Sequence, residues 1–334
     1  MTHIKPTDLI IATARGLYCA LGGFYIDPWQ PVERAIITHA HGDHLRAGSA
    51  KYYTAAAGAA VARHRLPADA SLESVAYGDS VKFGAVRVSL HSAVHILGSA
   101  QVRIEHAGEV WVVSGDYKRD KDPTCSPFDV VKCDVFISEA TFALPAYRWT
   151  PTALVALEIL EWWRSNSARG VASVLFAYAL GKAQRILAEL AVLTDESVFV
   201  HGAMACLVDL YRDQGIVMLP TAPATVSKAT NYAGSLILAP PSASGSTWRR
   251  RFGEHRTGFC SGWMRVRGDR RRRGYDRGFV LSDHADWPSL LRTFHDTGAS
   301  RILLTHGYTD AMCHYLQDQG VDASALRTEY GTEE

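Results

Sequence analysis

The feature that most constrains this chain is a short run that holds four candidate metal ligands, Thr38-His39-Ala40-His41-Gly42-Asp43-His44, in the pattern H-x-H-x-D-H. The run follows the apolar segment Ala35-Ile36-Ile37, which predicts a buried strand that ends where the histidines begin. Imidazole and carboxylate groups together suit Zn²⁺ or a similar first-row metal. The sequence therefore predicts a metal site at the end of a strand.

The spacing of these ligands favours two ions over one. His41, Asp43 and His44 are too crowded to share one ion comfortably, so we expect His39 and His41 on one ion and Asp43 and His44 on the other. Two ions roughly 3.5–4 Å apart stabilise both the attacking and the leaving oxygen of a displacement. The expected cofactor is therefore a pair of divalent ions, with Zn²⁺ preferred and Mn²⁺ or Fe²⁺ as alternatives.

Two ions need more ligands than this run supplies, and three later residues are candidates. His95 lies just before an expected strand, Asp116 follows the apolar strand Val110–Val113, and His306 ends the apolar segment 301–305. Each lies where a strand meets a Gly-containing loop, a place where side chains from separate strands converge on a ligand. A lone histidine there would have an ordinary structural role, but the first run already demands partners.

The organisation of the chain changes near residue 150. The 334 residues, 47% of them apolar, can bury a large core and suggest two domains or one domain with a large insert. Up to about residue 137 the pattern predicts short strands separated by turns. From Thr152 to Gln214 helices and strands alternate, which predicts a parallel sheet with covering helices. The chain ends with a strand, a helix, a strand and a helix.

Charge is unevenly distributed although the net charge is only +1. Between Arg249 and Arg277 there are eleven arginines and three acidic residues, so this stretch carries a charge of +8. The six cysteines show no C-x-x-C pair, so we expect free thiols and no thiolate zinc site. No segment approaches 18 apolar residues and no signal peptide is evident, so we expect a cytoplasmic protein without a membrane partner.

The ligand pattern resembles that of a known family. An H-x-H-x-D-H run, a later histidine, a Gly-Asp pair and a late His-Gly pair together resemble the metallo-β-lactamase fold. Glu139, in Ser138-Glu139-Ala140, and His284, in Asp283-His284-Ala285, match further motifs of its β-CASP branch, whose members are nucleases that act on DNA or RNA. The run from Glu139 to Trp149 is similar to the bacterial ligase-associated DNA exonucleases.

This resemblance implies a fold class and a domain order. The fold is an α/β fold, a metallo-β-lactamase αββα sandwich with an inserted α/β β-CASP domain. Residues 1–150 are expected to form the first part of the metallo-β-lactamase domain and residues 151–275 the inserted domain. Residues 276–334 are expected to return to the metallo-β-lactamase domain.

The resemblance also implies a role for each candidate residue. A metal-bound hydroxide attacks the phosphodiester phosphorus, and its nucleophilicity comes from a water pKa lowered to about 7 on Zn²⁺. His284 protonates the leaving oxygen, with Glu139 holding its other nitrogen and raising its pKa. Asp43, Glu139 and His284 are thus the expected catalytic residues. The expected metal ligands are His39, His41 and His95 for one ion and Asp43, His44 and His306 for the other, with Asp116 bridging.

Nucleic-acid contacts are expected at two places outside the metal site. Lys182 follows Gly181 at an expected helix start, where a helix N-terminus attracts phosphate, although a solvated lysine is the alternative. Arg270, Arg271, Arg272 and Arg273 lie shortly before His284, and we expect them to hold the phosphate backbone without sequence preference.

The expected function is hydrolysis of DNA from an end, as a 5′-directed exonuclease in DNA repair that acts on single-stranded or processed termini. The resemblance implies a DNA ligase and a helicase as partners. An RNA-processing nuclease remains an alternative, because RNA-processing members of the branch keep the histidine found here at His306. A metallo-hydrolase of small thioesters or lactams is a further alternative, but it would need no +8 surface. A binding module with a dead metal site is excluded because every ligand position is filled.

Overall fold

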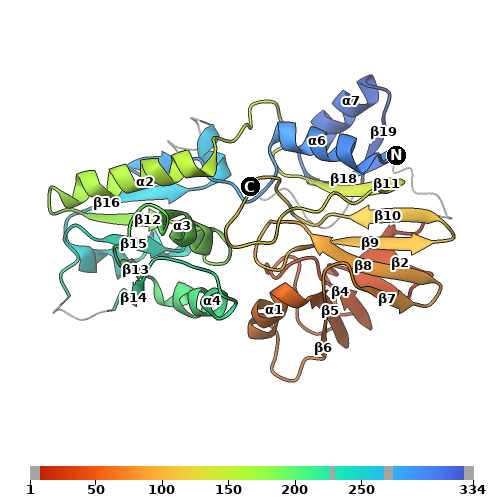
Figure 1. Cartoon of the computed structure of the whole chain (residues 1–334), viewed down its shortest axis with the longest axis horizontal. Coiled ribbons are helices and arrows are strands. Elements are labelled where there is room, and N and C mark those ends of the chain that lie inside the picture. The colour runs from red at the N-terminus through yellow and green to blue at the C-terminus, as the bar shows by residue number, and fades with distance from the viewer. Residues whose placement is uncertain (1–7, 226–229, 267–273, 327–334) are drawn as a thin grey trace. The chain divides into compact units, whose positions relative to one another are not determined.

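The computed structural model describes residues 8–225, 230–266 and 274–326. The chain divides into two compact units (Figure 1). The first unit comprises Met1–Lys121, Cys125–Arg148 and His284–Glu334. The second unit comprises Asp122–Thr124 and Trp149–Asp283.

The first unit contains two sheets, and the N-terminal one has six strands in chain order. The first three strands pair antiparallel, and pairing is parallel from the third to the sixth. A 3-10 turn, η1 (Ala56–Gly58), and helix α1 (Ala59–Arg65) follow the fifth strand. The strands are β1 (Ile11–Thr13), β2 (Gly16–Cys19), β3 (Phe24–Ile26), β4 (Arg34–Ile36), β5 (Lys51–Ala55) and β6 (Leu72–Val75).

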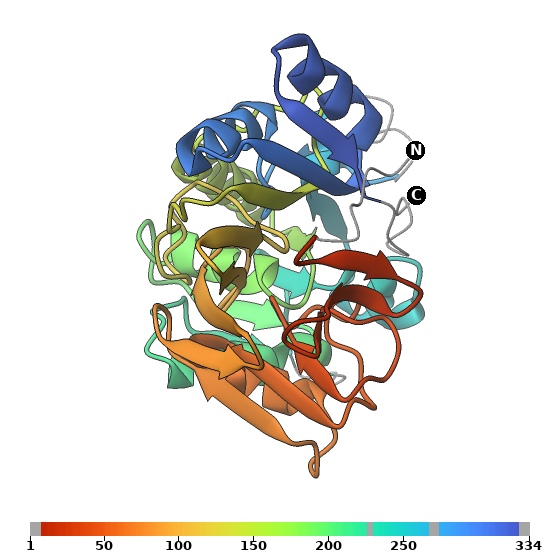
Figure 2. The same ribbon diagram turned by 90° about the vertical axis from the view of Figure 1, so that its right-hand side faces the viewer.

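The second sheet of this unit has seven strands in the order β19-β18-β11-β10-β9-β8-β7. Pairing is antiparallel from β7 to β10 and parallel from β10 to β19. Helix α6 (Trp287–Thr297) precedes β18 in the sequence and helix α7 (Thr309–Asp318) follows it (Figure 2). The strands are β7 (Ser80–Phe83), β8 (Val86–Ser92), β9 (Ala100–His106), β10 (Glu109–Val113), β11 (Val135–Ala140), β18 (Arg301–Gly307) and β19 (Asp322–Ala325).

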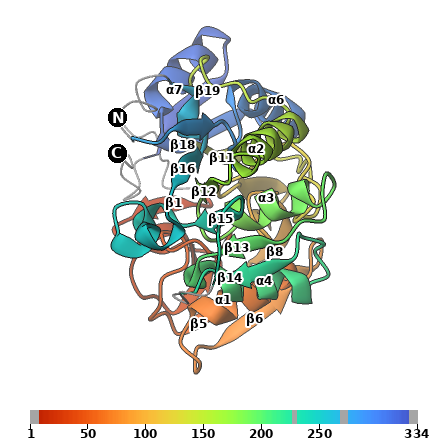
Figure 3. The same ribbon diagram turned by 90° about the vertical axis from the view of Figure 1, so that its left-hand side faces the viewer.

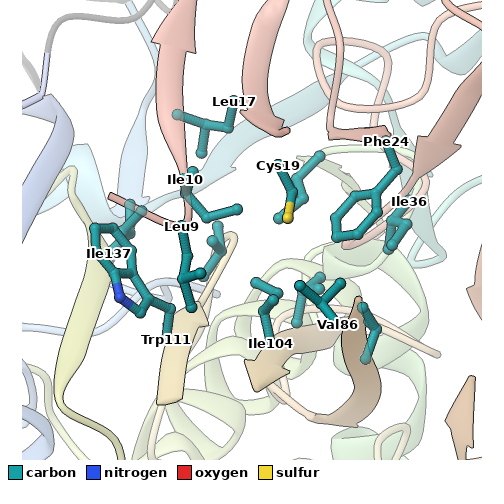
Figure 4. Close-up of a cluster of buried hydrophobic side chains, with 14 of the residues drawn as sticks. Leu9, Ile10, Leu17, Cys19, Phe24, Ile36, Val86, Ile104, Trp111 and Ile137 are labelled. Atoms are coloured by element: carbon teal, nitrogen blue, oxygen red, sulfur yellow. The ribbon is translucent and has the colours of Figure 1, made fainter. Parts of the chain in front are cut away.

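A buried apolar core joins the two sheets of the first unit (Figure 4). Phe24 and Ile36 from the first sheet belong to the same cluster as Ile104 and Trp111 from the second. On the other face of the second sheet, Phe136 packs in a separate cluster with side chains of α6 and α7. Strands β10, β11 and β18 are therefore covered on both faces, which explains why each contains a continuous apolar run.

The second unit is built on one six-stranded sheet in which every pairing is parallel (Figure 3). The strand order is β14-β13-β15-β12-β16-β17. The alternation of helices and strands expected after Thr152 is thus confirmed. The strands are β12 (Ala172–Phe176), β13 (Val198–Val200), β14 (Thr221–Pro223), β15 (Leu236–Ala239), β16 (His255–Cys260) and β17 (Arg277–Phe279). The helices are α2 (Thr152–Ser167), α3 (Lys182–Leu190) and α4 (Gly202–Asp213), with the 3-10 turns η2 (Pro241–Ala243), η3 (Thr247–Phe252) and η4 (Gly262–Arg265).

The boundaries of the second unit differ from those expected. The chain was expected to return to the first domain at residue 276, but the second unit extends to Asp283. The reason is strand β17, which pairs with β16 and so belongs to the parallel sheet of the second unit. The short segment Asp122–Thr124 also belongs to the second unit, which no sequence pattern indicated.

Among the described residues, no helix has both the length and the apolar character needed to cross a bilayer.

A close backbone approach fixes the loop between β8 and β9. Gly98 has a φ of 77°, and a Cβ added there would lie 2.0 Å from the Cα of Gly58. We expect Gly98→Ala to destabilise the protein by about 2–4 kcal/mol, because left-handed strain and steric overlap add. Gly108 is the matched control, since its φ is 87° and no atom lies within 4 Å of its added Cβ. Urea unfolding of both variants measures the difference, and equal losses would contradict the prediction.

Candidate metal centre

All seven expected metal ligands lie in the first unit, and six of them lie in loops that follow strands. The H-x-H-x-D-H run follows β4, and His95 lies between β8 and β9. Asp116 follows β10, and His306 is the next-to-last residue of β18. Four separate segments of the chain therefore supply the site, and both sheets of the unit contribute.

One group of side chains matches the ligand set expected for the first ion. Ligand atoms of His39, His41, His95 and Asp116 all lie within 4.8 Å of one another. Asp116 Oδ2 lies 3.5 Å from His39 Nε2 and 3.6 Å from His95 Nε2. His41 Nδ1 lies 3.0 Å from His95 Nε2. These residues could hold a metal ion together.

The same carboxylate also contacts the histidines expected for the second ion. Asp116 Oδ2 lies 3.6 Å from His44 Nε2, and its Oδ1 lies 3.2 Å from His306 Nε2. Asp43 Oδ2 is 3.6 Å from His44 Nε2. Asp116 thus stands between the two expected ligand sets. Glu139 also has a carboxylate oxygen within 4.8 Å of the ligand atoms of Asp116 and His306, which the sequence did not indicate.

The protonation states of His39 and Asp116 suit the binding of a cation. His39 Nε2 is buried and makes no hydrogen bond within the residues that the structure describes. Burial, and then the neighbouring His44, hold the pKa of His39 well below its usual range, so its imidazole is neutral. Although burial opposes ionisation of Asp116, neighbouring histidines, His44 first among them, hold its pKa well below the usual range. A neutral imidazole beside a carboxylate is a suitable donor set for Zn²⁺.

Asp27 contacts the candidate ligand His44, although no sequence argument identified it. This buried residue follows β3 with a φ of 43°. Its Oδ2 lies 2.7 Å from His44 Nδ1, and its Oδ1 accepts a hydrogen bond of 2.7 Å from the backbone N–H of Thr38. The Nδ1 contact leaves His44 Nε2 to face Asp116. An acidic residue at a strand end before Pro28 was the only available signal.

The carboxylates of Asp116 and Asp27 determine the direction in which the pKa of His44 shifts. Burial alone would lower the pKa of His44, but Asp116 and Asp27 outweigh it and raise this pKa to about 10. A metal ion and a proton therefore compete for His44 Nε2, so metal binding there would release a proton.

The loop that carries His95 is held by two further buried groups. Lys118 donates from Nζ to the His95 carbonyl oxygen at 2.9 Å. Ser99 Oγ accepts a hydrogen bond of 2.8 Å from the backbone N–H of His95. Val94 adopts a φ of 62°, which a β-branched residue rarely does. These contacts hold a strained turn that presents the His95 ring to the site.

The expected pair of His284 and Glu139 is also formed. Glu139 lies on β11 and is buried, with Oε2 2.8 Å from His284 Nδ1. Its Oε1 accepts a hydrogen bond of 2.8 Å from the backbone N–H of Tyr117. The His284 ring lies 4.7 Å from the ring of His95, measured between centroids, and its side chain is 24% exposed. The pair therefore lies beside the ligand cluster, with part of the imidazole open to solvent.

Of the residues expected to contact nucleic acid, only Lys182 lies within the described part of the chain. Lys182 is buried, and its ammonium group pairs with Asp283 within the second unit. It is therefore neither a solvated lysine nor placed to meet a phosphate, because its charge is turned to an internal carboxylate. Arg270, Arg271, Arg272 and Arg273 lie outside the described residues.

Comparison with known proteins shows relatives that carry out nucleic-acid chemistry. No family model matches the chain. A probable DNA ligase of Opitutus terrae is 32% identical over 318 residues, which are 94% of this chain and 30% of that protein. Endoribonuclease YSH1 of Saccharomyces cerevisiae is 30% identical over 118 residues, and that of Gibberella zeae is 29% identical over 119 residues. Each of these two matches covers 35% of this chain, and they cover 15% and 14% of the endoribonucleases.

The chain thus spans less than a third of the length of these relatives. Among solved structures, a protein of unknown function from Enterococcus faecalis V583 matches with a TM-score of 0.59 at 12% identity. The match covers 81% of this chain and 74% of that one. At this identity the likeness concerns the fold alone.

We expect Asp27→Asn to weaken metal binding by about 10–100-fold, because partners that orient a ligating histidine contribute that much to affinity. Competition against a coloured chelator measures the change. Asp69→Asn is the control, since Asp69 is exposed and makes the same change in charge away from the ligands. Native affinity in Asp27→Asn would show that His44 needs no such partner.

Proposed function

We propose that this chain is a binuclear-metal phosphodiesterase of the metallo-β-lactamase fold and its β-CASP branch, which degrades DNA from an end. The observation that carries the proposal is the position of Asp116 between the two expected ligand sets. Its Oδ2 faces His39 and His95 of one set and His44 of the other, and its Oδ1 faces His306. A carboxylate placed in this way suits a bridging ligand between two ions. The His284–Glu139 pair beside it suits proton transfer to a leaving group.

In this proposal the metal-holding residues and the His284–Glu139 pair have separate roles. Two ions bound here would supply a water of lowered pKa and a clamp on the attacking and leaving oxygens. They would be held by His39, His41 and His95 on one side and by Asp43, His44 and His306 on the other, with Asp116 between. The Glu139 carboxylate beside Nδ1 stabilises the imidazolium form of His284, in which Nε2 carries the proton that the leaving oxygen needs. Glu139 stays in place because the Tyr117 N–H holds its other oxygen.

The relatives support the substrate class. Their names concern DNA ligation and RNA cleavage, and both support a hydrolase of the nuclease type that works on nucleic acid. The ligase match covers nearly all of this chain, which favours DNA, and it also favours action together with a DNA ligase. A helicase is a further proposed partner, and Zn²⁺ is the proposed metal, with Mn²⁺ as the alternative.

A second candidate is an RNA-processing nuclease. The match to the endoribonucleases favours it, as does His306, whose imidazole lies 3.2 Å from Asp116. Both candidates share the same phosphodiester chemistry and differ in the nucleic acid that is bound.

The direct test uses matched DNA and RNA oligonucleotides labelled at either end and incubated with the metal-loaded protein. We expect progressive shortening of DNA from its 5′ end. Asp116→Ala is the inactive control, because loss of the bridging carboxylate should release metal and abolish cleavage together. Faster loss of RNA would favour the second candidate, and no cleavage of either would overturn the proposal.

We expect His284→Ala to retain both metals but to lower turnover by about 10²–10⁴-fold, the usual contribution of a general acid. Elemental analysis and initial rates measured on the same preparation separate the two effects. If the variant instead loses a metal, His284 is a ligand and the acid lies elsewhere.

Part of the +8 stretch is described, and we propose this part as a phosphate-binding surface of the second unit. Phe252 anchors the turn η3 in the core, and Arg251 lies over the Trp248 ring at 5.2 Å. Arg249 and Arg250 line a surface pocket, together with Ser246, Thr247 and His255. Among the described residues neither arginine forms an ion pair, so both guanidinium groups remain available for phosphate oxygens.

We expect Arg249→Ser with Arg250→Ser to weaken binding of a non-hydrolysable single-stranded oligonucleotide and to flatten its salt dependence. Each lost phosphate contact removes about 0.7 from the slope of log affinity against log salt. Arg164→Ser with Arg212→Ser is the control of equal charge change, since these arginines already face Glu196 and Asp209. An unaltered slope in the first double variant would show that the turn carries no phosphate contact.

A further inference from the structure

The second unit contains a buried group of four charged side chains that the proposed mechanism does not use. The two cations lie on the first turns of α3, and Arg185 is only 1% exposed. The two anions lie at the ends of the segments that make up this unit. The four residues are Asp122, Lys182, Arg185 and Asp283.

Arg185 contacts three segments of the chain that are distant in sequence. Its Nη1 donates to the Ser282 carbonyl oxygen at 2.7 Å and to Asp283 Oδ1 at 3.0 Å. Its Nη2 donates to Thr152 Oγ1 at 2.5 Å, and its Nε lies 3.5 Å from Asp122 Oδ2. One guanidinium group therefore holds the first, the middle and the last segment by which the chain enters or leaves this unit.

The last of these segments is held twice. Lys182 donates from Nζ to Asp283 Oδ2 while Arg185 occupies Oδ1, so both carboxylate oxygens are engaged by cations. The carbonyl of the preceding Ser282 is engaged as well. The backbone at residues 282–283 is thus fixed by both main-chain and side-chain contacts.

The residue after Asp283 is His284, the proposed acid. The Cα atoms of consecutive residues are joined by one planar peptide and lie about 3.8 Å apart. A fixed Asp283 therefore limits where the His284 backbone lies. Catalytic groups tolerate little displacement, since an error of about 1 Å can lower the rate about 10²-fold.

We propose that Arg185 is a positioning residue for His284, acting through Ser282 and Asp283. The inference rests on the proposed function, because that function gives His284 its role. The residue type fits, since the planar guanidinium group has five donors in a fixed geometry and reaches several acceptors at once. A lysine keeps the charge but cannot bridge the same three segments.

The test compares Arg185→Lys with Arg301→Lys in the zinc-loaded chain of 334 residues. Arg301 is the matched control, because it is a buried arginine paired with Asp8 at 3.0 and 3.2 Å and lies at the far end of β18 from His306. We expect Arg185→Lys to lower kcat at least 10-fold with KM and the two bound metals unchanged. Arg301→Lys should lower the melting temperature and leave kcat unchanged.

A second measurement does not depend on nuclease activity. The Nδ1 proton of His284 is shared with Glu139, and its NMR signal is assigned by its absence in His284→Ala. We expect this signal to shift or broaden in Arg185→Lys and to stay unchanged in Arg301→Lys. An unchanged signal in Arg185→Lys overturns the positioning role. Absence of cleavage by the native protein overturns the proposed function instead, and the NMR comparison still decides the role of Arg185.

Discussion

The buried carboxylate of Asp116 is the interaction on which the rest of the site depends. It lies within 3.6 Å of imidazole nitrogens from His39, His95, His44 and His306, which come from three other segments of the chain. A buried carboxylate is costly unless opposite charge or hydrogen bonds compensate it. Two metal ions would provide that compensation, and the histidines would provide it only in part. The loops around the site therefore bring to this one carboxylate the imidazole groups that could hold metal ions together with it.

The two sheets make this convergence possible. The run after β4 comes from one sheet, and the loops after β8 and β10 come from the other. The core between the sheets fixes where those strands end, and Asp27, Lys118 and Ser99 then fix how the ligands are presented. Packing thus determines the position of the site, and hydrogen bonds to individual histidines determine its geometry.

Much of this arrangement was predictable, because the ligands are close in sequence or lie at strand ends. The parallel sheet of the second unit followed from alternating helix and strand patterns and is confirmed. Asp27 was missed because its role depends on a contact with His44, 17 residues away, that leaves no periodic signal. Lys182 was misjudged because a helix start predicts phosphate binding only when the side chain is exposed, and the partner Asp283 is 101 residues away. The unit boundary at Asp283 depends on the pairing of β17 with β16, and a strand pattern in the sequence does not show which strand it pairs with.

The brief passage of the chain through the second unit at Asp122–Thr124 limits how modular that unit can be. A gene fragment coding only for residues 149–283 would lack Asp122 and leave the buried guanidinium of Arg185 with one carboxylate fewer. The remaining contacts of Arg185 with Asp283 and Ser282 would compensate its charge only in part, so the fragment should be less stable than the same unit in this chain. A transplant of this unit into another scaffold, by design or by recombination, would have to carry both discontinuous pieces of sequence, because residues 149–283 alone omit the Asp122 counter-ion.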